Sequence, residues 1–598
     1  MNCAPRNDVL RRSGVLWAGQ LVILFTLAGI AGLAQTSRTI QLACSGDGAA
    51  DDSTCFQNAI NNAHGATLRV PKPAVCYRLA HSISIKAPVH VLGSASRICM
   101  DIPLSGNSTA GRLFDISSSD VTLENLWIDG SGAATGIPSG DRYAFFAAGS
   151  AAQHIANVHV LNSRVTNLTE SDGRRPATHT ASFGAYFQWV DDSSLINNVI
   201  ENVSADAIHF VSTQRITVQK NDIRSPGWGG VVAYGDDSGF DIGFNRVTGS
   251  VDSQRLTIAA VTNSSPCTLR FTSAHRLRSG DQIVIYGGRG AWQRIDYTPA
   301  HPNFTVNVVS PTEVTIPFDS SSLGPLGDQL NAIPAAATTR YWAGSYDAPS
   351  NEAVKRAPDV NGQIHDNYAS GMHMYGAVYR LGSGRGLIIS NNVAENIEAG
   401  SIPTSMLAIS PRCAGMDCSD RGLSDIRILG NHFVASGRYL NCINIQNKVP
   451  DNSANLPAAY GISIENNQCV SPGPQSCFAN GIMVNGQDGG IRNVTVRGNT
   501  VEGDDTKPWA VVRGVVTVIA GTSAAASSAI VSNNVSTCGG IPNPRSVGIQ
   551  LGPHSRDIAV DSNAVAQHGT AIMVDPQSER PVVGRNNRFQ NTQRAVTR

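Results

Sequence analysis

A three-residue pattern that recurs every 24 residues constrains the fold of this chain more than any other feature of its sequence. The pattern Asn-x-(Val/Ile) begins at Asn197, Asn221 and Asn245, so both steps are 24 (221−197 and 245−221). Each repeat also holds a short run of strand character, FGAYF at 183–187, AIHFV at 207–211 and VVAYG at 231–235. A period of about 20–50 residues indicates a repeat architecture, and strands without helical patterns between them predict a parallel β-helix.

A stack of coils explains why such a repeat is stable. One coil cannot bury its inward Ile, Val and Phe side chains alone, whereas coils about 4.8 Å apart bury a continuous apolar column and complete each other's backbone ladders. The anchor Asn of each coil is expected to hydrogen-bond to the Asn above and below it. Alternatively, Asn is there because it tolerates left-handed backbone at a turn. Both interpretations place it at a corner of the coil.

The Asn pattern returns later in the chain with a variable step. It resumes at Asn367 and Asn391, again 24 apart, after an interruption that begins beyond Asn245. Later steps are mostly longer than 24, and we interpret the excess as loop length. The remaining anchors are Asn431, Asn467, Asn499, Asn533, Asn563 and Asn587.

Composition narrows the class of function. The 598 residues include 45 basic and 45 acidic side chains, so the formal net charge is zero and nothing points to nucleic acid. Residues 1–34 resemble an export signal, with Arg6, Arg11 and Arg12 before the apolar stretch from Leu21 to Leu33. The alternative for this segment is an uncleaved anchor, although its core is short for a membrane span. We therefore predict a secreted protein, extracellular or periplasmic, with no membrane attachment after cleavage.

Eleven of the twelve cysteines follow the predicted signal, and in an oxidising compartment such cysteines form disulfides. Their spacing does not resemble a zinc cluster. An odd number leaves at least one thiol free, and Cys267 is our candidate. Sequence alone does not fix the pairing, but near neighbours suggest Cys44–Cys55, Cys76–Cys99, Cys413–Cys418 and Cys469–Cys477.

A short helix is predicted before the repeats. Asp52 or Ser53 can cap it, and its apolar residues Phe56, Ala59, Ile60 and Ala63 fall at helical spacing, so it is expected to plug the open end of the stack. The order Asp-Gly-x-x-Asp-Asp-x-x-x-x-Gln-x-Ala-Ile from Asp47, followed by Val-Pro and Cys-Tyr-Arg-Leu, resembles the opening of the pectate-lyase-like superfamily, in particular its rhamnogalacturonase/epimerase-like branch. The resemblance implies a right-handed parallel β-helix that acts on or binds polysaccharide.

The interruption of the repeat predicts an inserted domain. Between 251 and 345 the runs RLTIAAV, TLRFTS, DQIVIYGG, FTVNVV and EVTIPF read as strands separated by turns. We interpret 251–345 as a small β-barrel or sandwich inserted between two parts of the β-helix, 35–250 and 346–598. A wider coil with a long loop is the alternative, but loops of that length rarely lack structure of their own.

The richest patch of chemistry lies in the 24-residue repeats. Strand alternation places His209 on the face opposite Ile208 and Phe210, so Asp206 and His209 can be presented together as catalytic groups. Aromatic faces stack on sugar rings, and carboxylates and cations bind polar substituents. The candidate substrate-binding residues are Tyr186, Trp228, Tyr234, Asp236, Asp237, Arg380 and His373.

Each candidate also has an interpretation without function. Asp236 and Asp237 stand at a position equivalent to Asp191 and Asp192, where Asp favours turns for backbone reasons. His209 can be an exposed strand residue and Arg380 an ordinary surface cation. His365, His373 and Tyr375 form a weaker second cluster.

The motifs of the superfamily's polygalacturonase-type hydrolases are mostly missing. Those enzymes carry Asn-Thr-Asp, Asp-Asp, Gly-His-Gly and Arg-Ile-Lys on successive coils, whereas this chain keeps only the second Asp of the Asp-Asp pair, as Asp206. Phe183 stands near the first Asp position, and Gly229 and Gly230 stand where the His motif would fall. Inverting hydrolysis needs two carboxylates, so this departure weakens that prediction.

Two classes of function therefore stay open. One is a secreted polysaccharide lyase or glycosidase, acting on a uronate-containing or related polysaccharide in a groove of the β-helix walled by the insertion. A lyase needs a base and a group that neutralises the uronate carboxylate, which can be Arg, Lys or Ca²⁺. The other is a noncatalytic glycan-binding or surface-structural protein of the same fold.

Overall fold

A computed structural model describes most of the chain beyond residue 37. Among these residues the protein is mostly β-strand with one α-helix. The described ranges are 38–102, 110–130, 141–168, 182–203, 205–227, 229–249, 256–275, 277–286, 290–295, 304–326, 330–334, 346–348, 358–374, 377–399, 404–411, 422–434, 440–447, 457–470, 480–486, 490–502, 514–520, 526–532, 535–537 and 543–598.

Three short strands make up one coil, and each pairs in parallel with its equivalent in the next coil. In one coil, β13 (Ser182–Gln188) is followed by β15 (Ser194–Ile196) and β16 (Val199–Val203). The next coil repeats them as β17 (Ile208–Val211), β18 (Thr217–Gln219) and β19 (Asp222–Pro226), and the three pairings β13–β17, β15–β18 and β16–β19 are all parallel. This topology is the predicted parallel β-helix, and it is consistent with the right-handed sense that crossovers between parallel strands favour.

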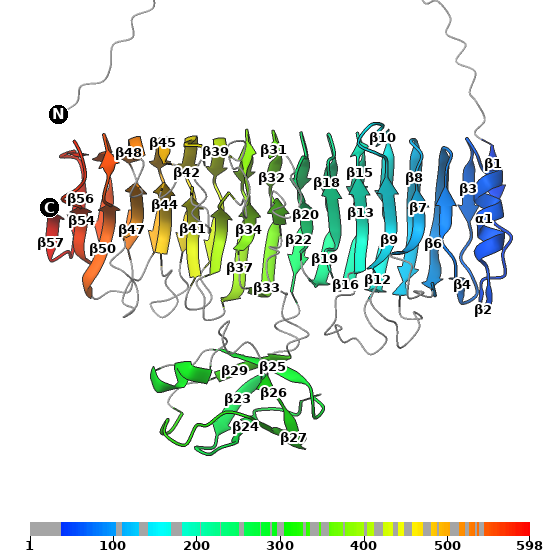
Figure 1. Ribbon diagram of the computed structural model, residues 1–598, viewed down its shortest axis with the longest axis horizontal. Coiled ribbons are helices and arrows are strands. Elements are labelled where there is room, and N and C mark those ends of the chain that lie inside the picture. The colour runs from blue at the N-terminus through cyan, green and yellow to red at the C-terminus, as the bar shows by residue number, and fades with distance from the viewer. Residues whose placement is uncertain are drawn as a thin grey trace, which may run out of the picture. The chain divides into compact units, whose positions relative to one another are not determined.

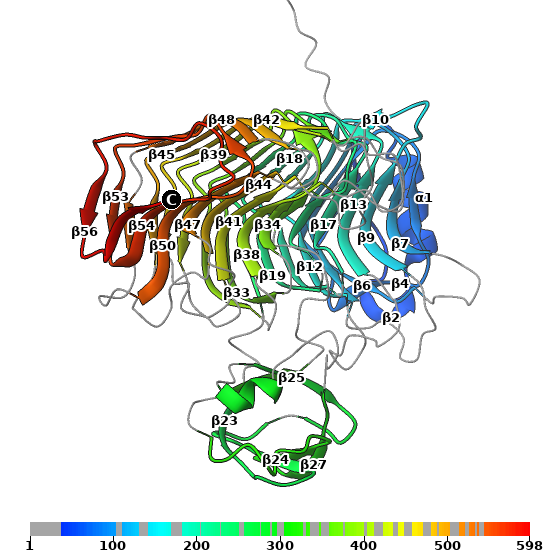
Figure 2. The same cartoon turned by 60° about the vertical axis from the view of Figure 1, so that its left-hand side comes forward.

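Figures 1 and 2 show the coils in chain order along the stack. The first strand of each coil belongs to a 15-stranded sheet, called sheet B here, and the other two stacks join into one 33-stranded sheet. They join because early strands such as β6 (Val89–Met100) and β8 (Val121–Asp129) span both stacks. The strands of sheet B are β5 (Ile83–Ile85), β7 (Ala110–Ile116), β9 (Asp141–Ala148), β13, β17, β20 (Val231–Ala233), β30 (Tyr346–Ala348), β34 (Ala377–Leu381), β38 (Thr404–Ile409), β41 (Leu440–Gln446), β44 (Asn480–Gly486), β47 (Gly514–Ala520), β50 (Asn543–Leu551), β54 (His568–Val574) and β57 (Arg594–Thr597).

An Asn ladder runs along the corner between the second and third strands of the coil. Asn221 Nδ2 donates to Asn245 Oδ1 at 2.9 Å and to the Leu195 carbonyl at 2.9 Å, while Asn221 Oδ1 accepts from the amide of the coil before. Because donors and acceptors alternate along the stack, the buried side chains satisfy one another. The continuous ladder contains Asn198, Asn221, Asn245, Asn367, Asn392, Asn431, Asn467 and Asn499, and Asn563 pairs with Asn587 further on.

Two of the predicted anchors are wrong by one residue. The ladder contains Asn198 and Asn392, whereas Asn197 and Asn391 have positive φ, 58° and 55°, and turn the chain at the corner. The steps are therefore 23 between Asn198 and Asn221 and 25 between Asn367 and Asn392. Asn533 lies outside the described residues.

The predicted helix is α1 (Ser53–Asn62), and it packs against the N-terminal end of the stack. Phe56, Ile60 and Ala63 are buried in the same apolar core as the inward side chains of the first coils. Asp52 is the N-cap residue by position, but its carboxylate accepts from the Ser45 and Gly46 amides instead of from the helix. These contacts tie the segment before the helix to the helix start.

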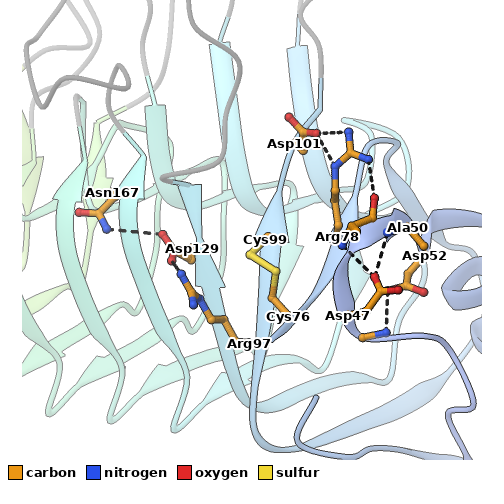
Figure 3. Close-up of a disulfide and its surroundings, with 12 residues drawn as sticks. Asp47, Ala50, Asp52, Cys76, Arg78, Arg97, Cys99, Asp101, Asp129 and Asn167 are labelled. Atoms are coloured by element: carbon orange, nitrogen blue, oxygen red, sulfur yellow. Dashed lines mark hydrogen bonds and ion pairs between the residues drawn. A yellow bond between two sulfur atoms is a disulfide. The ribbon is translucent and has the colours of Figure 1, made fainter. Parts of the chain in front are cut away.

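Disulfides and ion pairs join the cap to the early coils. Cys44–Cys55 and Cys76–Cys99 form as predicted, and Figure 3 shows Cys76–Cys99 between the Arg78–Asp101 and Arg97–Asp129 pairs. Cys469 pairs with Cys442 of the same coil, so the predicted Cys469–Cys477 bond is wrong. Cys267 is free and buried, and Cys413 and Cys418 lie outside the described residues.

Between β22 (Arg246–Thr248) and β30, the chain forms a separate antiparallel sheet. Its seven strands are ordered β26-β25-β29-β23-β24-β28-β27, and they enclose an apolar cluster of their own that includes Leu269, Ile285 and Trp292. The strands are β23 (Leu256–Val261), β24 (Cys267–Phe271), β25 (Gln282–Tyr286), β26 (Phe304–Thr305), β27 (Asn307–Ser310), β28 (Glu313–Ile316) and β29 (Leu330–Pro334).

The solenoid resumes in register after these strands. β20 pairs with β30, β21 (Asp241–Gly243) pairs with β32 (Gln363–His365), and β22 pairs with β33 (Tyr368–Met374). Asn245 bonds directly to Asn367 at 3.0 Å although 122 residues separate them. The domain bounds of 251–345 stay a prediction.

Disulfides are typical of oxidising compartments outside the cytosol. The predicted signal, residues 1–34, lies outside the described part of the chain. Within that part, no helix has the length and apolar character of a membrane span.

Candidate active site

Side chains on the outward face of sheet B line up because equivalent residues of successive coils are paired. The register aligns Phe146 of β9 with Tyr186 of β13, and Tyr186 with His209 of β17. The neighbouring residues Phe145, Phe187 and Phe210 point the other way, into the apolar core. Residues at the same position of adjacent coils are about 4.8 Å apart, which is close to the spacing of stacked rings.

Asp206 and His209 form a buried hydrogen-bonded pair, as the sequence predicts that they could. Asp206 Oδ2 lies 2.8 Å from His209 Nδ1, and the two residues expose 5% and 6% of their surface. Asp206 Oδ1 and His209 Nε2 are both buried, and neither has a hydrogen-bond partner among the residues that the structure describes. An unpaired buried polar atom costs about 1–3 kcal/mol, so two of them side by side mark an exception to ordinary packing.

Aromatic rings hold the imidazole on both sides. The Tyr186 ring stacks on His209 with centroids 4.6 Å apart and an interplanar angle of 7°, and Tyr234 lies 4.8 Å away at 47°. Phe183 meets the imidazole edge-on at 5.6 Å. Tyr186 also stacks on Phe146 at 5.4 Å, so rings of the chain itself occupy both of its faces. Tyr186 therefore offers no free ring face to a sugar.

A second row of side chains runs beside the first. Tyr143 stacks on Phe183 with ring centroids 5.0 Å apart. Asp206 occupies the equivalent position in the next coil, because the Gly184 amide donates to the Asp206 carbonyl. Burial raises the pKa of the Tyr143 hydroxyl, which also donates to Asp141. Arg112, in the coil before Tyr143, lies over the Phe146 ring at 3.6 Å.

The sequence reasoning did not predict these aromatic rows. The signal was present, because polar or aromatic pairs three residues apart recur at Arg112/Asp115, Tyr143/Phe146, Phe183/Tyr186 and Asp206/His209. The number of residues between successive pairs differs, since loops of different length precede each strand, and these pairs therefore do not show a period of 24.

We call Tyr143, Phe146, Phe183, Tyr186, Asp206, His209 and Tyr234 the aromatic cluster.

Asp236 and Asp237 belong to a corner of the coil and not to this cluster. Asp237 is 1% exposed, and its Oδ1 accepts from the amide and hydroxyl of Thr213 at 2.9 and 2.8 Å. Burial raises the pKa of Asp237 to about 8, although the hydrogen bonds from Thr213 and Gly235 oppose that shift. Asp236 is exposed and has a positive φ of 61°. This arrangement matches the turn interpretation of both residues.

Two further candidates lie away from the pair. Arg380 stands in the same outward column of sheet B as His209, but β20 and β30 separate their coils, so the spacing is three coils, or about 14 Å. His373 lies in β33 of the 33-stranded sheet, where its backbone position is in register with that of Glu398 in the neighbouring strand. Trp228 and Tyr375 lie outside the described residues.

His365 belongs to a different contact. Its Nε2 lies 2.7 Å from Asp241 Oδ1 in the coil before the antiparallel sheet, and its Nδ1 lies 2.7 Å from Asp366 Oδ2. Within the part of the chain that the structure describes, no group of three or more His, Cys, Asp or Glu side chains could hold a metal ion.

Comparisons with known proteins give low similarity. No family model matches the sequence, and no curated protein matches it. Among solved structures, the mannuronan C-5 epimerase AlgE6 A-module of Azotobacter vinelandii aligns with 92% of this chain and 97% of its own, at 12% identity and a TM-score of 0.37. The surface adhesin PfbA of Streptococcus pneumoniae aligns with 94% of this chain and 92% of its own, at 10% identity and a TM-score of 0.40.

A third structure, the catalytic unit of a GH87 α-1,3-glucanase from Streptomyces thermodiastaticus, aligns with 93% of this chain and 67% of its own, at 12% identity and a TM-score of 0.39. Likenesses of this size carry no argument about activity, so the fold assignment rests on the strand pairings and the Asn ladder. By those pairings the chain is a parallel β-helix, the fold that its opening motif implies through its resemblance to the pectate-lyase-like superfamily.

Proposed function

We propose that this protein is a secreted polysaccharide-active enzyme in which Asp206 and His209 transfer a proton. One observation carries the proposal: a carboxylate and an imidazole share a 2.8 Å hydrogen bond on the outward face of sheet B, and the second polar atom of each is buried with no partner in the described part of the chain. A buried pair of this kind is unfavourable for stability unless another group completes it. A sugar hydroxyl is suited to do so, because it can donate a hydrogen bond to either atom.

The contact suggests which atom reacts. If His209 Nδ1 carries the proton and donates it to Asp206 Oδ2, then Nε2 keeps its lone pair and can act as a general base. Asp206 also stabilises the imidazolium that forms when Nε2 takes a proton. The Asp–His contact thus fixes both the tautomer and the direction of the base.

Elimination fits this pair better than hydrolysis. Hydrolysis of a glycosidic bond generally uses two carboxylates, whereas Asp206 is the one carboxylate of the aromatic cluster as defined above. In elimination on a uronate, Nε2 removes the proton on C5, the C4–O bond to the leaving sugar breaks, and a C4=C5 double bond forms. The proton on Nε2 can then pass to the leaving oxygen, so the imidazole returns to its starting state.

The surrounding charges support an acidic substrate. Arg112 and Arg380 share the outward face of sheet B with the pair, each three coils away and on opposite sides, or about 14 Å along the stack. We propose that they contact other sugar units of an extended chain and not the unit that loses its proton. The strands between β22 and β30 are proposed as an inserted domain covering 251–345 and walling the binding groove.

The test is cleavage of defined uronate polysaccharides, with alginate and polygalacturonate as first probes. We expect Asp206→Asn and His209→Ala to lower the rate of double-bond formation by about 10²–10⁴-fold, the usual contribution of a positioned acid–base group, with little change in thermal unfolding. His432→Ala is the control, because His432 lies in β40 (His432–Val434) of the other sheet and bonds to the neutral Gln468. Equal rates for wild type and both variants would overturn the assignment.

The burial of the pair favours a second candidate function, glycan binding without cleavage. Asp206 and His209 expose only 5% and 6% of their surface, and a reacting sugar has to reach His209 Nε2. In affinity electrophoresis, the test is whether gels that contain the same polysaccharides retard the wild-type protein although no products form. If they do, and if His209→Ala weakens that retardation, the binding function replaces the enzymatic one.

A further inference from the structure

We propose that Arg112, Phe146 and Tyr186 form a stacked column that positions the His209 imidazole, so that Phe146 and Tyr186 are positioning residues and not platforms for sugar rings. This inference rests on the proposed function for its consequence in catalysis. Its geometric basis is independent, because it comes from four side chains in successive coils of sheet B.

The column is continuous from the cation to the imidazole. The Arg112 guanidinium lies over the Phe146 ring at 3.6 Å. Phe146 and Tyr186 stack at 5.4 Å with an interplanar angle of 8°, and Tyr186 and His209 stack at 4.6 Å with an angle of 7°. The three rings are therefore close to parallel, as the regular coil spacing requires for equivalent side chains.

The hydrogen bond to Asp206 and the flanking rings together leave the imidazole no freedom to turn. The hydrogen bond from His209 Nδ1 to Asp206 Oδ2 selects which edge of the ring faces the carboxylate. That bond alone lets the ring tilt about its χ2 torsion, which is broad for His. The Tyr186 face removes this tilt, and Tyr234 limits movement on the other side at 4.8 Å. His209 Nε2 then has one direction.

The charged end of the column is itself held in place. Arg112 Nη1 lies 3.3 Å from Asp115 Oδ1, and Asp115 occupies the Phe146 position in the coil before. A guanidinium over a ring contributes about 0.5–2 kcal/mol depending on its exposure, so Arg112 favours one placement of Phe146. Phe146 in turn limits the position of Tyr186.

The expected cost of a loose base is kinetic. A catalytic group that is free to tilt spends less time in the reactive geometry, and misplacement by about 1 Å can lower a rate by about 10²-fold. Substrate binding, in contrast, depends on other contacts along the face. Loosening the column is therefore expected to lower kcat and to leave KM nearly unchanged.

The experiment compares Tyr186→Phe, which keeps the ring, with Tyr186→Leu, which keeps bulk and apolar character but removes the stack. On alginate or polygalacturonate we expect Tyr186→Phe to retain kcat within about 3-fold and Tyr186→Leu to lose about 10–100-fold in kcat at similar KM. In a His209→Ala background, Tyr186→Leu should cause no further loss, because the ring that it positions is gone.

A second readout does not require activity. In spectra of protein carrying ¹³C-labelled histidine, the His209 ring signal should keep its ring-current shift in Tyr186→Phe and lose it in Tyr186→Leu, with the other histidine signals unmoved. If His209→Ala abolishes cleavage but Tyr186→Leu leaves both kcat and the His209 signal unchanged, the column fails and the proposed function stands. If wild type cleaves nothing while the signal moves as expected, the proposed function fails and the column stands.

Discussion

The Asn ladder and the aromatic cluster both bury polar side chains of the same repeat, but the hydrogen bonding of these side chains differs. In the ladder, Asn221 uses its amide nitrogen on Asn245 and Leu195 and its amide oxygen on Asn198. In the cluster, Asp206 and His209 bond to each other, and one atom of each has no partner among the described residues. The ladder is closed and stabilises the stack, whereas the cluster is open, as a site that binds another molecule has to be.

The largest effect is expected where a closed network is broken. Asn221→Ala removes the acceptor of both Asn198 donors and the donor to the Leu195 carbonyl, all within the core. Each orphaned buried group costs about 1–3 kcal/mol, and because some will find water, we expect a loss of about 3 kcal/mol in the free energy of unfolding. Urea unfolding measures it.

Asn197→Gly is the matched control for that variant. Asn197 precedes the ladder residue and has a φ of 58°, and its side-chain amide donates to the exposed Asn162 side chain. Glycine accepts this backbone conformation without strain, so the change should stay within about 0.5 kcal/mol. Equal losses for Asn197→Gly and Asn221→Ala would mean that the ladder is not the stabilising element of the corner.

A buried carboxyl in a neighbouring corner sharpens the comparison through pH. Burial raises the pKa of Asp237 to about 8, against 3.8 for the ordinary side chain. The folded chain therefore holds this proton to higher pH than the unfolded chain does, and stability falls as pH rises from about 4 to about 8. We expect the difference in unfolding free energy between wild type and Asp237→Asn to change by about 2 kcal/mol between pH 6 and pH 8, with wild type losing relative stability as pH rises.

Asp236→Asn tests whether that change belongs to the buried residue. Asp236 is exposed, and its φ of 61° is one that Asn also tolerates. Its unfolding profile should run parallel to that of wild type over the same pH range. A flat difference for Asp237→Asn would show that this carboxyl ionises with an ordinary pKa in the folded chain.

The sequence predicts the coil well where loops are short. The step of 24 is regular from β13 to β22 and returns only singly later, between Asn367 and Asn391 and between Asn563 and Asn587, because longer loops change it elsewhere. Asn197 and Asn198 are both Asn, and no local signal says which of them takes the positive φ and which points inward. Closeness in sequence likewise favours Cys477 as the partner of Cys469, whereas the path of one coil brings Cys442, 27 residues away in sequence, next to it.

The site was only partly predictable for a related reason. Asp206 and His209 share one strand region, so their contact follows from local spacing. The rings around His209 come from three coils, and the steps between Phe146, Tyr186 and His209 are 40 and 23 residues. Such a cluster is defined by the register between coils, which depends on how much chain each loop removes.

The open pair is expected to cost stability, and removing it should show this. In Asp206→Ala/His209→Phe, both polar partners are replaced by apolar groups, and the new ring can stack on Tyr186 as the imidazole does. Replacing both members of a buried polar pair is often neutral or stabilising, so we expect the unfolding free energy to be unchanged or to rise by about 1 kcal/mol while activity is lost.

The single variant Asp206→Ala separates the two parts of this effect. It leaves the imidazole buried with neither nitrogen paired within the cluster, and should lower stability by about 1–2 kcal/mol. A double variant that unfolds at lower urea than Asp206→Ala would indicate that the pair is a structural contact and not an open site.

The smallest effect is expected at His365, where a His bonds to two carboxylates near the surface. Both ring nitrogens face acceptors, Asp241 at 2.7 Å and Asp366 at 2.7 Å, so the contact requires the imidazolium form. Burial alone would lower the pKa of His365, but the hydrogen bonds to Asp366 and Asp241 outweigh it and raise that pKa.

A raised pKa means that the contribution of His365 is fully present below the unfolded pKa of about 6.5 and is lost as pH rises through the folded value. Because the side chains of Asp241 and Asp366 are 38% and 35% exposed, we expect the stabilisation relative to His365→Gln to fall by only about 0.5–1 kcal/mol between pH 5.5 and pH 8.5. His432→Gln, whose partner Gln468 is neutral, should show no such change. Since His365 and Asp241 join the coils on either side of the antiparallel sheet, a pH-independent difference would mean that the strand pairing and the Asn245–Asn367 bond, and not this ion pair, hold the junction.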